Sequence, residues 1–222
     1  MSGFCATRSV ALAALLAASS AASQAAFTLD FEGVGNGAQI LDFYNGGQDS
    51  QSHGGANYGV SFGANSLALI DADAGGNGNF ANEPTASTVM FFTTGTAVLN
   101  YAAGFTTGFS FYYSSGTSAS VNVYDGLNAT GHLLGSINLL AQYHDNCVGD
   151  PTGAYCNWSV GSVAFGGLAK SIDFGGTVNR TAYDNITFGS TTPDAAVPEP
   201  GSLALVAPAL AGLAAVRRRR KA

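Results

Sequence analysis

The segment Phe27-Thr28-Leu29-Asp30-Phe31 alternates apolar and polar residues with a period of two. Successive side chains of a β-strand point to opposite faces of a sheet, so this alternation is typical of a strand with one buried face. Similar short runs, each bounded by turn-forming Gly, Asn, Asp or Ser, follow at Thr88–Phe92, Phe109–Tyr112, Val121–Tyr124, Ser171–Phe174 and Tyr183–Phe188.

We expect about eleven or twelve such strands, and no amphipathic helix, between Ala26 and Ala196. Gly-Gly pairs predict loops or bends at 46–47, 54–55, 75–76, 166–167 and 175–176. The predicted fold class is all-β: an antiparallel β-sandwich of the jelly-roll type, flanked by an N-terminal signal helix and a C-terminal apolar helix. A single closed barrel is the alternative, and the sequence does not separate the two.

The charges of this 222-residue chain are segregated along the sequence. It has 14 acidic and 8 basic residues, for a net charge of -6. Between Ala26 and Ala196 lie 13 of the acids but only two bases, Lys170 and Arg180, which leaves this part near -11. The lack of a basic face excludes a nucleic-acid-binding protein. An apolar fraction of 46% argues against an acidic disordered chain.

The N-terminal residues have the order of a secretory signal peptide. A single base, Arg8, precedes an apolar run from Val10 to Ala18, and Ser23-Gln24-Ala25 has the small-x-small form that signal peptidase accepts. We therefore predict a signal peptide over 1–25, removed by signal peptidase, and a β-sandwich domain over 26–192.

The C-terminal residues also point to a membrane. A linker over 193–200 is followed by an apolar run over 201–216 and by the basic cluster Arg217, Arg218, Arg219 and Arg220. Sixteen helical residues span about 24 Å, which is short for a hydrocarbon core of about 30 Å, and Pro208 weakens the helix further. The basic cluster fits the positive-inside rule. On these grounds residues 201–222 form a marginal tail anchor or a transient sorting signal.

Val197-Pro198-Glu199-Pro200, the apolar run and the arginine cluster together resemble the C-terminal sorting signal of PEP-CTERM proteins. The resemblance implies that Pro198, Glu199 and Pro200 are recognised by exosortase, a membrane-embedded transpeptidase. It also implies transient contact with the inner membrane and export to the cell envelope, the cell surface or the extracellular matrix. The signal covers about a tenth of the chain and implies nothing about the activity of the domain.

Two cysteines remain after removal of the signal peptide, Cys147 and Cys156. They enclose a short segment in which Pro151 and Gly153 favour a reversal of the chain. In an exported protein this pair predicts a disulfide. A metal-binding or catalytic thiol beside His144 is the alternative.

The segment Leu69–Glu83 places five oxygen donors along a glycine-rich turn: Asp71, Asp73, Asn77, Asn79 and Glu83. Calcium binds about six to eight such oxygens, so Asp71, Asp73 and Asn77 are candidate ligands. The spacing is not that of an EF-hand loop. Asx residues are also common in turns simply because they satisfy the backbone, and this alternative stays open.

A second calcium hypothesis rests on a resemblance. Asp30-Phe31-Glu32 near the start of the domain and Asp184-Asn185-Ile186 near its end resemble the terminal strands of carbohydrate-binding-module-like sandwiches. The resemblance implies a structural calcium between Glu32 and Asp184. Alternatively, these acids alternate outward from a buried phenylalanine stripe.

The sequence contains no Gly-x-Ser-x-Gly, His-Glu-x-x-His or Walker motif, and its three histidines stand singly, so we predict that the protein is not an enzyme. Aromatic rings beside amides suit sugar binding. The candidate rings, of which half or more are expected in the core, are Tyr44, Tyr58, Tyr112, Tyr113, Tyr143, Tyr155 and Trp158. The predicted function is therefore structural or exopolysaccharide-associated, with a calcium-dependent lectin-like module or a secreted carbohydrate-active enzyme as alternatives.

Overall fold

A computed structural model describes residues 26–142, 147, 148, 150 and 153–194. In this part of the chain nine antiparallel strands and no helix occur, so the predicted all-β class is confirmed. A helix with the length and apolar character that a membrane crossing needs is likewise absent from it. Several predicted features lie outside the described residues: the signal peptide, Pro198-Glu199-Pro200, the apolar run and the basic cluster.

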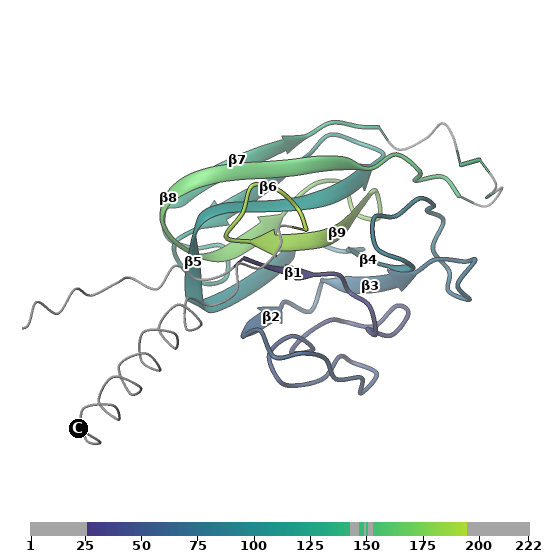
Figure 1. The fold of residues 1–222 in the computed structure, drawn as a ribbon, viewed down its shortest axis with the longest axis horizontal. Helices are drawn as coiled ribbons and strands as arrows, with labels where there is room; N and C mark the ends of the chain where they lie inside the picture. Colours follow the sequence, from purple (N-terminus) through teal and green to yellow (C-terminus); the bar gives the residue numbers. More distant parts are fainter. Residues whose placement is uncertain (1–25, 143–146, 149, 151–152, 195–222) are drawn as a thin grey trace, which may run out of the picture.

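The strands form one sheet in the order β3-β4-β9-β5-β8-β6-β7, with β1 paired to β9 and β2 paired to β5 (Figure 1). Because β3 and β7 end this order without pairing to each other, the described sheet is not a closed barrel. The strands are β1 (Phe27–Leu29), β2 (Val60–Phe62), β3 (Leu67–Ile70), β4 (Thr88–Phe91), β5 (Ala97–Ser115), β6 (Ala119–Tyr124), β7 (Leu133–Leu139), β8 (Ser159–Phe174) and β9 (Thr181–Phe188).

Two long strands, β5 and β8, bend and divide the sheet into two layers. The first part of β5 pairs with β2 and with the end of β8, whereas its second part pairs with the start of β8 and with β9. The register shifts where the two strands turn, near Gly104 (φ 74°) and Gly167 (φ 98°). Both φ values lie in the left-handed region that favours glycine. Figure 1 shows β5 and β8 curving together at one edge of the molecule.

One layer therefore contains β7, β6, the end of β8, the start of β5 and β2. The other contains the start of β8, the end of β5, β9, β4 and β3, with β1 beside β9. The sequence led us to expect more strands because each half of β5 and β8 reads as a separate short run. Of the predicted Gly-Gly bends, the pair at 166–167 coincides with this turn.

Aromatic rings from both layers fill the space between them. The ring of Phe174 in β8 lies 6.1 Å from that of Phe109, 5.9 Å from that of Phe111 and 4.8 Å from that of Tyr183, measured between centroids. These four residues are fully buried. Edge-to-face packing of this kind adds to the free energy gained from burying the rings. The core thus holds the two layers together through β5, β8 and β9.

We predict that Phe174→Ala lowers the free energy of unfolding by about 3–5 kcal/mol, because it leaves a cavity between the layers. Chemical denaturation monitored by circular dichroism measures this change. The control is Leu133→Ala on β7, where the side chain is 55% exposed and the expected loss is below about 0.5 kcal/mol. Equal losses in the two variants would contradict this assignment of the core.

Candidate functional site

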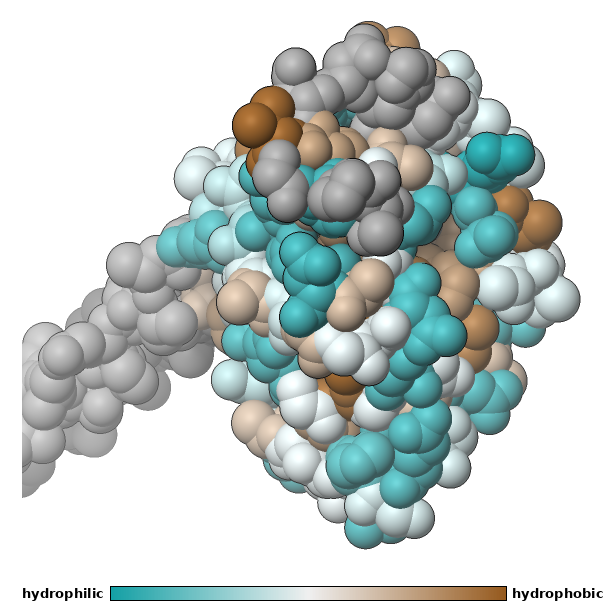
Figure 2. Space-filling view, turned by 90° about the vertical axis from the view of Figure 1, so that its right-hand side faces the viewer, coloured by the Kyte–Doolittle hydropathy of each residue, from teal (hydrophilic) through white to brown (hydrophobic). Residues whose placement is uncertain are grey.

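Two loops meet at one end of the sandwich, on the right-hand side of Figure 1. The first contains the glycine-rich turn (residues 71–78) after β3, and the second is the disulfide loop (residues 147–156) before β8. Cys147 and Cys156 are bonded, with their Cα atoms 5.3 Å apart, so the disulfide expected from their spacing is present. Seen from this end, the surface is largely hydrophilic with small apolar patches (Figure 2).

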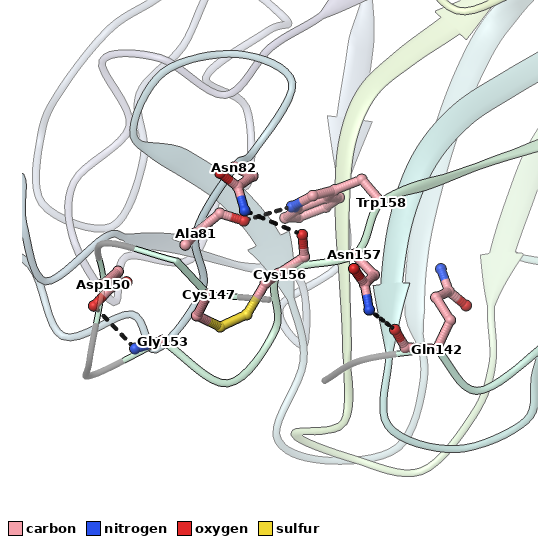
Figure 3. The surroundings of a disulfide bond; sticks show 9 residues. All are labelled: Ala81, Asn82, Gln142, Cys147, Asp150, Gly153, Cys156, Asn157 and Trp158. Carbon is pink, nitrogen blue, oxygen red and sulfur yellow. Dashed lines mark hydrogen bonds between the residues drawn. A yellow bond between two sulfur atoms is a disulfide. The ribbon is translucent and has the colours of Figure 1, made fainter. Parts of the chain in front are cut away.

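Hydrogen bonds join the segment after the glycine-rich turn to the disulfide loop. The backbone N–H groups of Ala154 and Tyr155 donate to the carbonyl of Asn79, at 2.6 and 3.1 Å, and the N–H of Ala81 donates to the carbonyl of Tyr155 at 3.0 Å. The indole Nε1 of Trp158 donates to the carbonyl of Ala81 at 3.0 Å (Figure 3). The two loops therefore form one connected unit.

The glycine-rich turn is closed by its own backbone. The carbonyl of Asp71 accepts hydrogen bonds from the N–H groups of Ala74 (3.1 Å) and Gly76 (2.8 Å). A side chain at Gly76 would collide with the carbonyl of Ile70, so this position requires glycine. The tight turn brings the Asp71 and Asp73 side chains to the same side of the loop.

Carboxylates from both loops converge. One carboxylate oxygen from each of Asp71, Asp73 and Asp150 lies within 4.8 Å of the other two. Together with Glu83 they line a pocket of about 570 Å³. Burial raises the pKa of Asp71, and the neighbouring charges of Asp150 and Asp73 raise it further. This acidic cluster contains residues from two segments that are far apart in the sequence.

Two of the three candidate ligands in this segment, Asp71 and Asp73, belong to the acidic cluster, and Glu83, another of the five oxygen donors, lines the same pocket. The third, Asn77, is engaged elsewhere, since its side-chain oxygen accepts a hydrogen bond of 2.6 Å from Asn36. Sequence reasoning missed Asp150. Its place inside the predicted Cys147–Cys156 loop was the available signal, but nothing in the sequence places that loop beside the glycine-rich turn.

Glu32 and Asp184, the second predicted pair, lie close enough for the charge of Glu32 to raise the pKa of Asp184. A short segment that ends at the first residue of β4 donates hydrogen bonds to both carboxylates. Thr85 N–H donates to Asp184 Oδ2 at 2.9 Å, and Thr88 N–H donates to Glu32 Oε1 at 2.8 Å. Ser87 Oγ is 3.1 Å from Glu32 Oε2. Through these hydrogen bonds, Glu32 and Asp184 connect the two ends of the domain to β4 and to the segment before it.

Asp184 is a buried carboxylate on the outer face of β9. Asp184 follows Tyr183, whose side chain lies in the core, so it lies on the outer face of β9. It is nevertheless fully buried, because the segment around Thr85 covers it. Burial is the main cause that raises its pKa to about 8, and the charges of Glu32 and Asp30 add to the effect.

A second apolar cluster and a groove of about 460 Å³ lie on this outer face. Val89 and Ala182 alternate with the core residues Met90 and Tyr183, so they point away from the core. Phe80, Val89 and Ala182 form the buried part of this cluster. The groove is lined by Leu69, Asn79, Phe80, Val89, Phe91, Ala154, Tyr155, Val178, Asn179, Arg180, Thr181 and Ala182.

The aromatic residues considered for sugar binding have different environments. Tyr44 and Tyr113 belong to the core, as expected for part of this set. Tyr58 is 41% exposed and stacks on Phe27. Of the described members, Tyr155 lines the groove, and Trp158 packs against its apolar floor, edge-on to Phe80. Tyr143 lies outside the described residues.

No protein-family model matches the sequence, and no curated protein matches it. Among solved structures, the K2 cleaved adhesin domain of Lys-gingipain is similar with a TM-score of 0.48 and 14% identity, covering 74% of this chain and 99% of that one. CsCBM6-3 from Clostridium stercorarium, in complex with cellobiose, is similar with a TM-score of 0.38 and 14% identity, covering 60% and 87%. A family 6 carbohydrate-binding module is similar with a TM-score of 0.36 and 13% identity, covering 60% of this chain and 87% of that one. Similarity at this level assigns no ligand or activity to the chain.

We predict that the unfolding free energy, measured in EDTA, falls as the pH rises from about 4 to about 8. A folded-state pKa near 8 against 3.8 for the free carboxyl means that Asp184 stabilises the fold while it is protonated and loses this contribution across that window. The slope from one such group reaches about 1.4 kcal/mol per pH unit. Urea denaturation at several pH values measures it.

The variant Asp184→Asn should flatten this slope whatever its absolute stability. The control Asp42→Asn removes an exposed aspartate elsewhere in the domain. A slope in Asp184→Asn as steep as in the wild type would show that another group is responsible. Repeating the titration with calcium tests the predicted Glu32–Asp184 ion, since a bound ion would suppress the slope of the wild type.

Proposed function

We propose that this chain is an exported cell-surface or matrix protein whose jelly-roll-like sandwich binds polysaccharide without catalysing a reaction. The observation that carries the proposal is the groove on the outer face of β3, β4 and β9. It combines the ring of Tyr155 with the amides of Asn79 and Asn179 and the guanidinium of Arg180. Such a combination suits a sugar, because a ring stacks on its apolar face while polar groups bond its hydroxyls.

The chemistry of the groove favours binding over hydrolysis. Glycosidases use a pair of carboxyl groups that flank the scissile bond. Among the described residues, those that line the groove include no carboxylate. This is why we propose a binding module rather than a secreted glycosidase.

The charge of the domain indicates the class of polysaccharide. With 13 acids and two bases between residues 26 and 196, the domain would repel an acidic polymer over most of its surface. Arg180 is exposed at the rim of the groove and supplies hydrogen-bond donors to hydroxyl oxygens. A neutral exopolysaccharide is therefore the proposed ligand.

Export is supported by two independent features. The Cys147–Cys156 disulfide is typical of proteins that fold in an oxidising compartment. The sequence of the tail, from Val197 to Ala222, resembles the PEP-CTERM sorting signal described above. We propose that signal peptidase and exosortase process the two ends and deliver the domain to the envelope.

We predict that Asn79→Ala and Arg180→Ala each weaken binding of the full-length chain to a neutral polysaccharide about tenfold, which is about 1.4 kcal/mol. Both side chains are exposed, and the described hydrogen bonds of both residues use backbone atoms, so the fold should be kept. Affinity electrophoresis in gels containing neutral or acidic polysaccharide measures the change.

The control for Arg180→Ala is Lys170→Ala, which removes the other base of the domain, a residue of β8 that does not line the groove. If both groove variants were retarded in polysaccharide gels as strongly as the wild type, the groove would not be the binding site. Retardation by acidic polymers alone would contradict the proposed ligand class, and no retardation by any polymer would favour a purely structural role.

We predict that a chain ending before Val197 is lost from the envelope fraction and appears in the medium or the periplasm. The reason is that it lacks the proposed sorting motif and basic cluster. Cell fractionation followed by immunoblotting measures the distribution. Replacing Pro198, Glu199 and Pro200 by alanine while keeping the apolar run separates the sorting motif from simple membrane anchoring. An unchanged distribution in both variants would contradict the sorting hypothesis.

A further inference from the structure

The acidic cluster contains a buried carboxylate oxygen with unused bonding capacity. Asp71 is 8% exposed, and its Oδ1 atom is buried without a hydrogen-bond partner. A buried, unsatisfied carboxylate oxygen is costly unless something else compensates it. Asp71 lines the same pocket as Asp73, Glu83 and Asp150.

Basic side chains do not provide that compensation in the part of the chain that the structure describes. In that part the close contacts between a basic and an acidic side chain are His53–Asp49 and His132–Asp125, both outside the cluster. Glu83 adds to the negative charge, since Asp71 is among the groups whose charge raises the pKa of Glu83, after the larger effect of burial. Asp71, Asp73 and Glu83 thus line one pocket, and no Lys or Arg among the described residues forms an ion pair with them.

The donor set suits a hard divalent cation, and its spacing is compatible with calcium. All the side-chain donors of the cluster are carboxylate oxygens, which hard cations prefer. Calcium binds oxygens at about 2.4 Å, so two oxygens around one ion lie at most about 4.8 Å apart. The carboxylates of Asp71, Asp73 and Asp150 meet this limit. Magnesium requires a smaller and more regular shell.

We propose that Asp71, Asp73 and Asp150 together bind one calcium ion that ties the glycine-rich turn to the disulfide loop. Glu83 lies at the same pocket and is available to complete the shell with water. Asp150 is held for this role, since its Oδ1 accepts a hydrogen bond of 3.0 Å from the N–H of Gly153 (Figure 3). The site uses a residue from each loop and differs from the predicted Glu32–Asp184 pair.

Calcium in this place would organise the groove from one side. Asn79, which directly follows the glycine-rich turn, and Ala154 and Tyr155 of the disulfide loop line the groove, so the ion would lie beside the segments that form one side of it. Trp158, which follows the disulfide loop, donates a hydrogen bond to Ala81, which follows the glycine-rich turn, and it is the single tryptophan of the chain. Its fluorescence therefore reports the arrangement of the loops. The proposal stands independently of polysaccharide binding.

The test is isothermal titration of the full-length protein, after EDTA treatment and dialysis, with calcium chloride and separately with magnesium chloride. We expect calcium to bind more tightly than magnesium and to shift the emission of Trp158. Asp71→Asn and Asp73→Asn should each weaken calcium binding at least about tenfold, because each removes one charged ligand. Asp73 is exposed, so its variant should fold even if Asp71→Asn does not.

Asp42→Asn is the matched control, an exposed aspartate outside the cluster, and should keep wild-type affinity. Asp184→Asn should also keep the binding event that shifts the emission of Trp158. The proposal would be overturned by absent calcium binding in the wild type, or by wild-type affinity in Asp73→Asn. Loss of that event in Asp184→Asn alone would place the ion between the terminal strands and would equally overturn it.

Discussion

The bend shared by β5 and β8 is the constraint on which the rest of the molecule depends. Because both strands turn near Gly104 and Gly167, a single antiparallel sheet covers both sides of its own core. The same turn sets Phe109 and Phe111 against Phe174, which lies in the other layer. It also places β9 beside the second half of β5. Residues from the loops that precede β4 and β8 then pack on the outer face of β9.

The outer face of β9 shows how the acidic character of the domain is accommodated. Asp184 is buried there under backbone donors, and its pKa of about 8 reflects that environment. A short distance along the same face the environment changes to an apolar groove with a single exposed base, Arg180. Buried carboxylates, an acidic pocket and an apolar groove therefore occupy neighbouring parts of the domain.

The sequence predicted the fold class well because alternation is a local property, readable in runs such as Phe27–Phe31. It did not predict that two of the strands would be 19 and 16 residues long, since a bent strand looks like two short ones. The candidate site was predicted less completely. Asp71 and Asp73 are close in sequence, whereas Asp150 is brought beside them by long-range hydrogen bonds such as those between Asn79 and Ala154 and Tyr155. Asn77 had the right chemistry, but a contact with Asn36 engages it elsewhere.

The pairing of β1 with β9 also governs when the domain can fold. Thr28 and Thr187 share a hydrogen bond across 159 residues, and β9 lies between β5 on one side and β1 and β4 on the other. Contacts of such long range form late, because the loop between them must close first. A chain crossing a membrane from its N-terminal end would deliver β9 last. Such a chain would therefore reach the far side unfolded and assemble its sheet only after nearly all of the domain had been transferred.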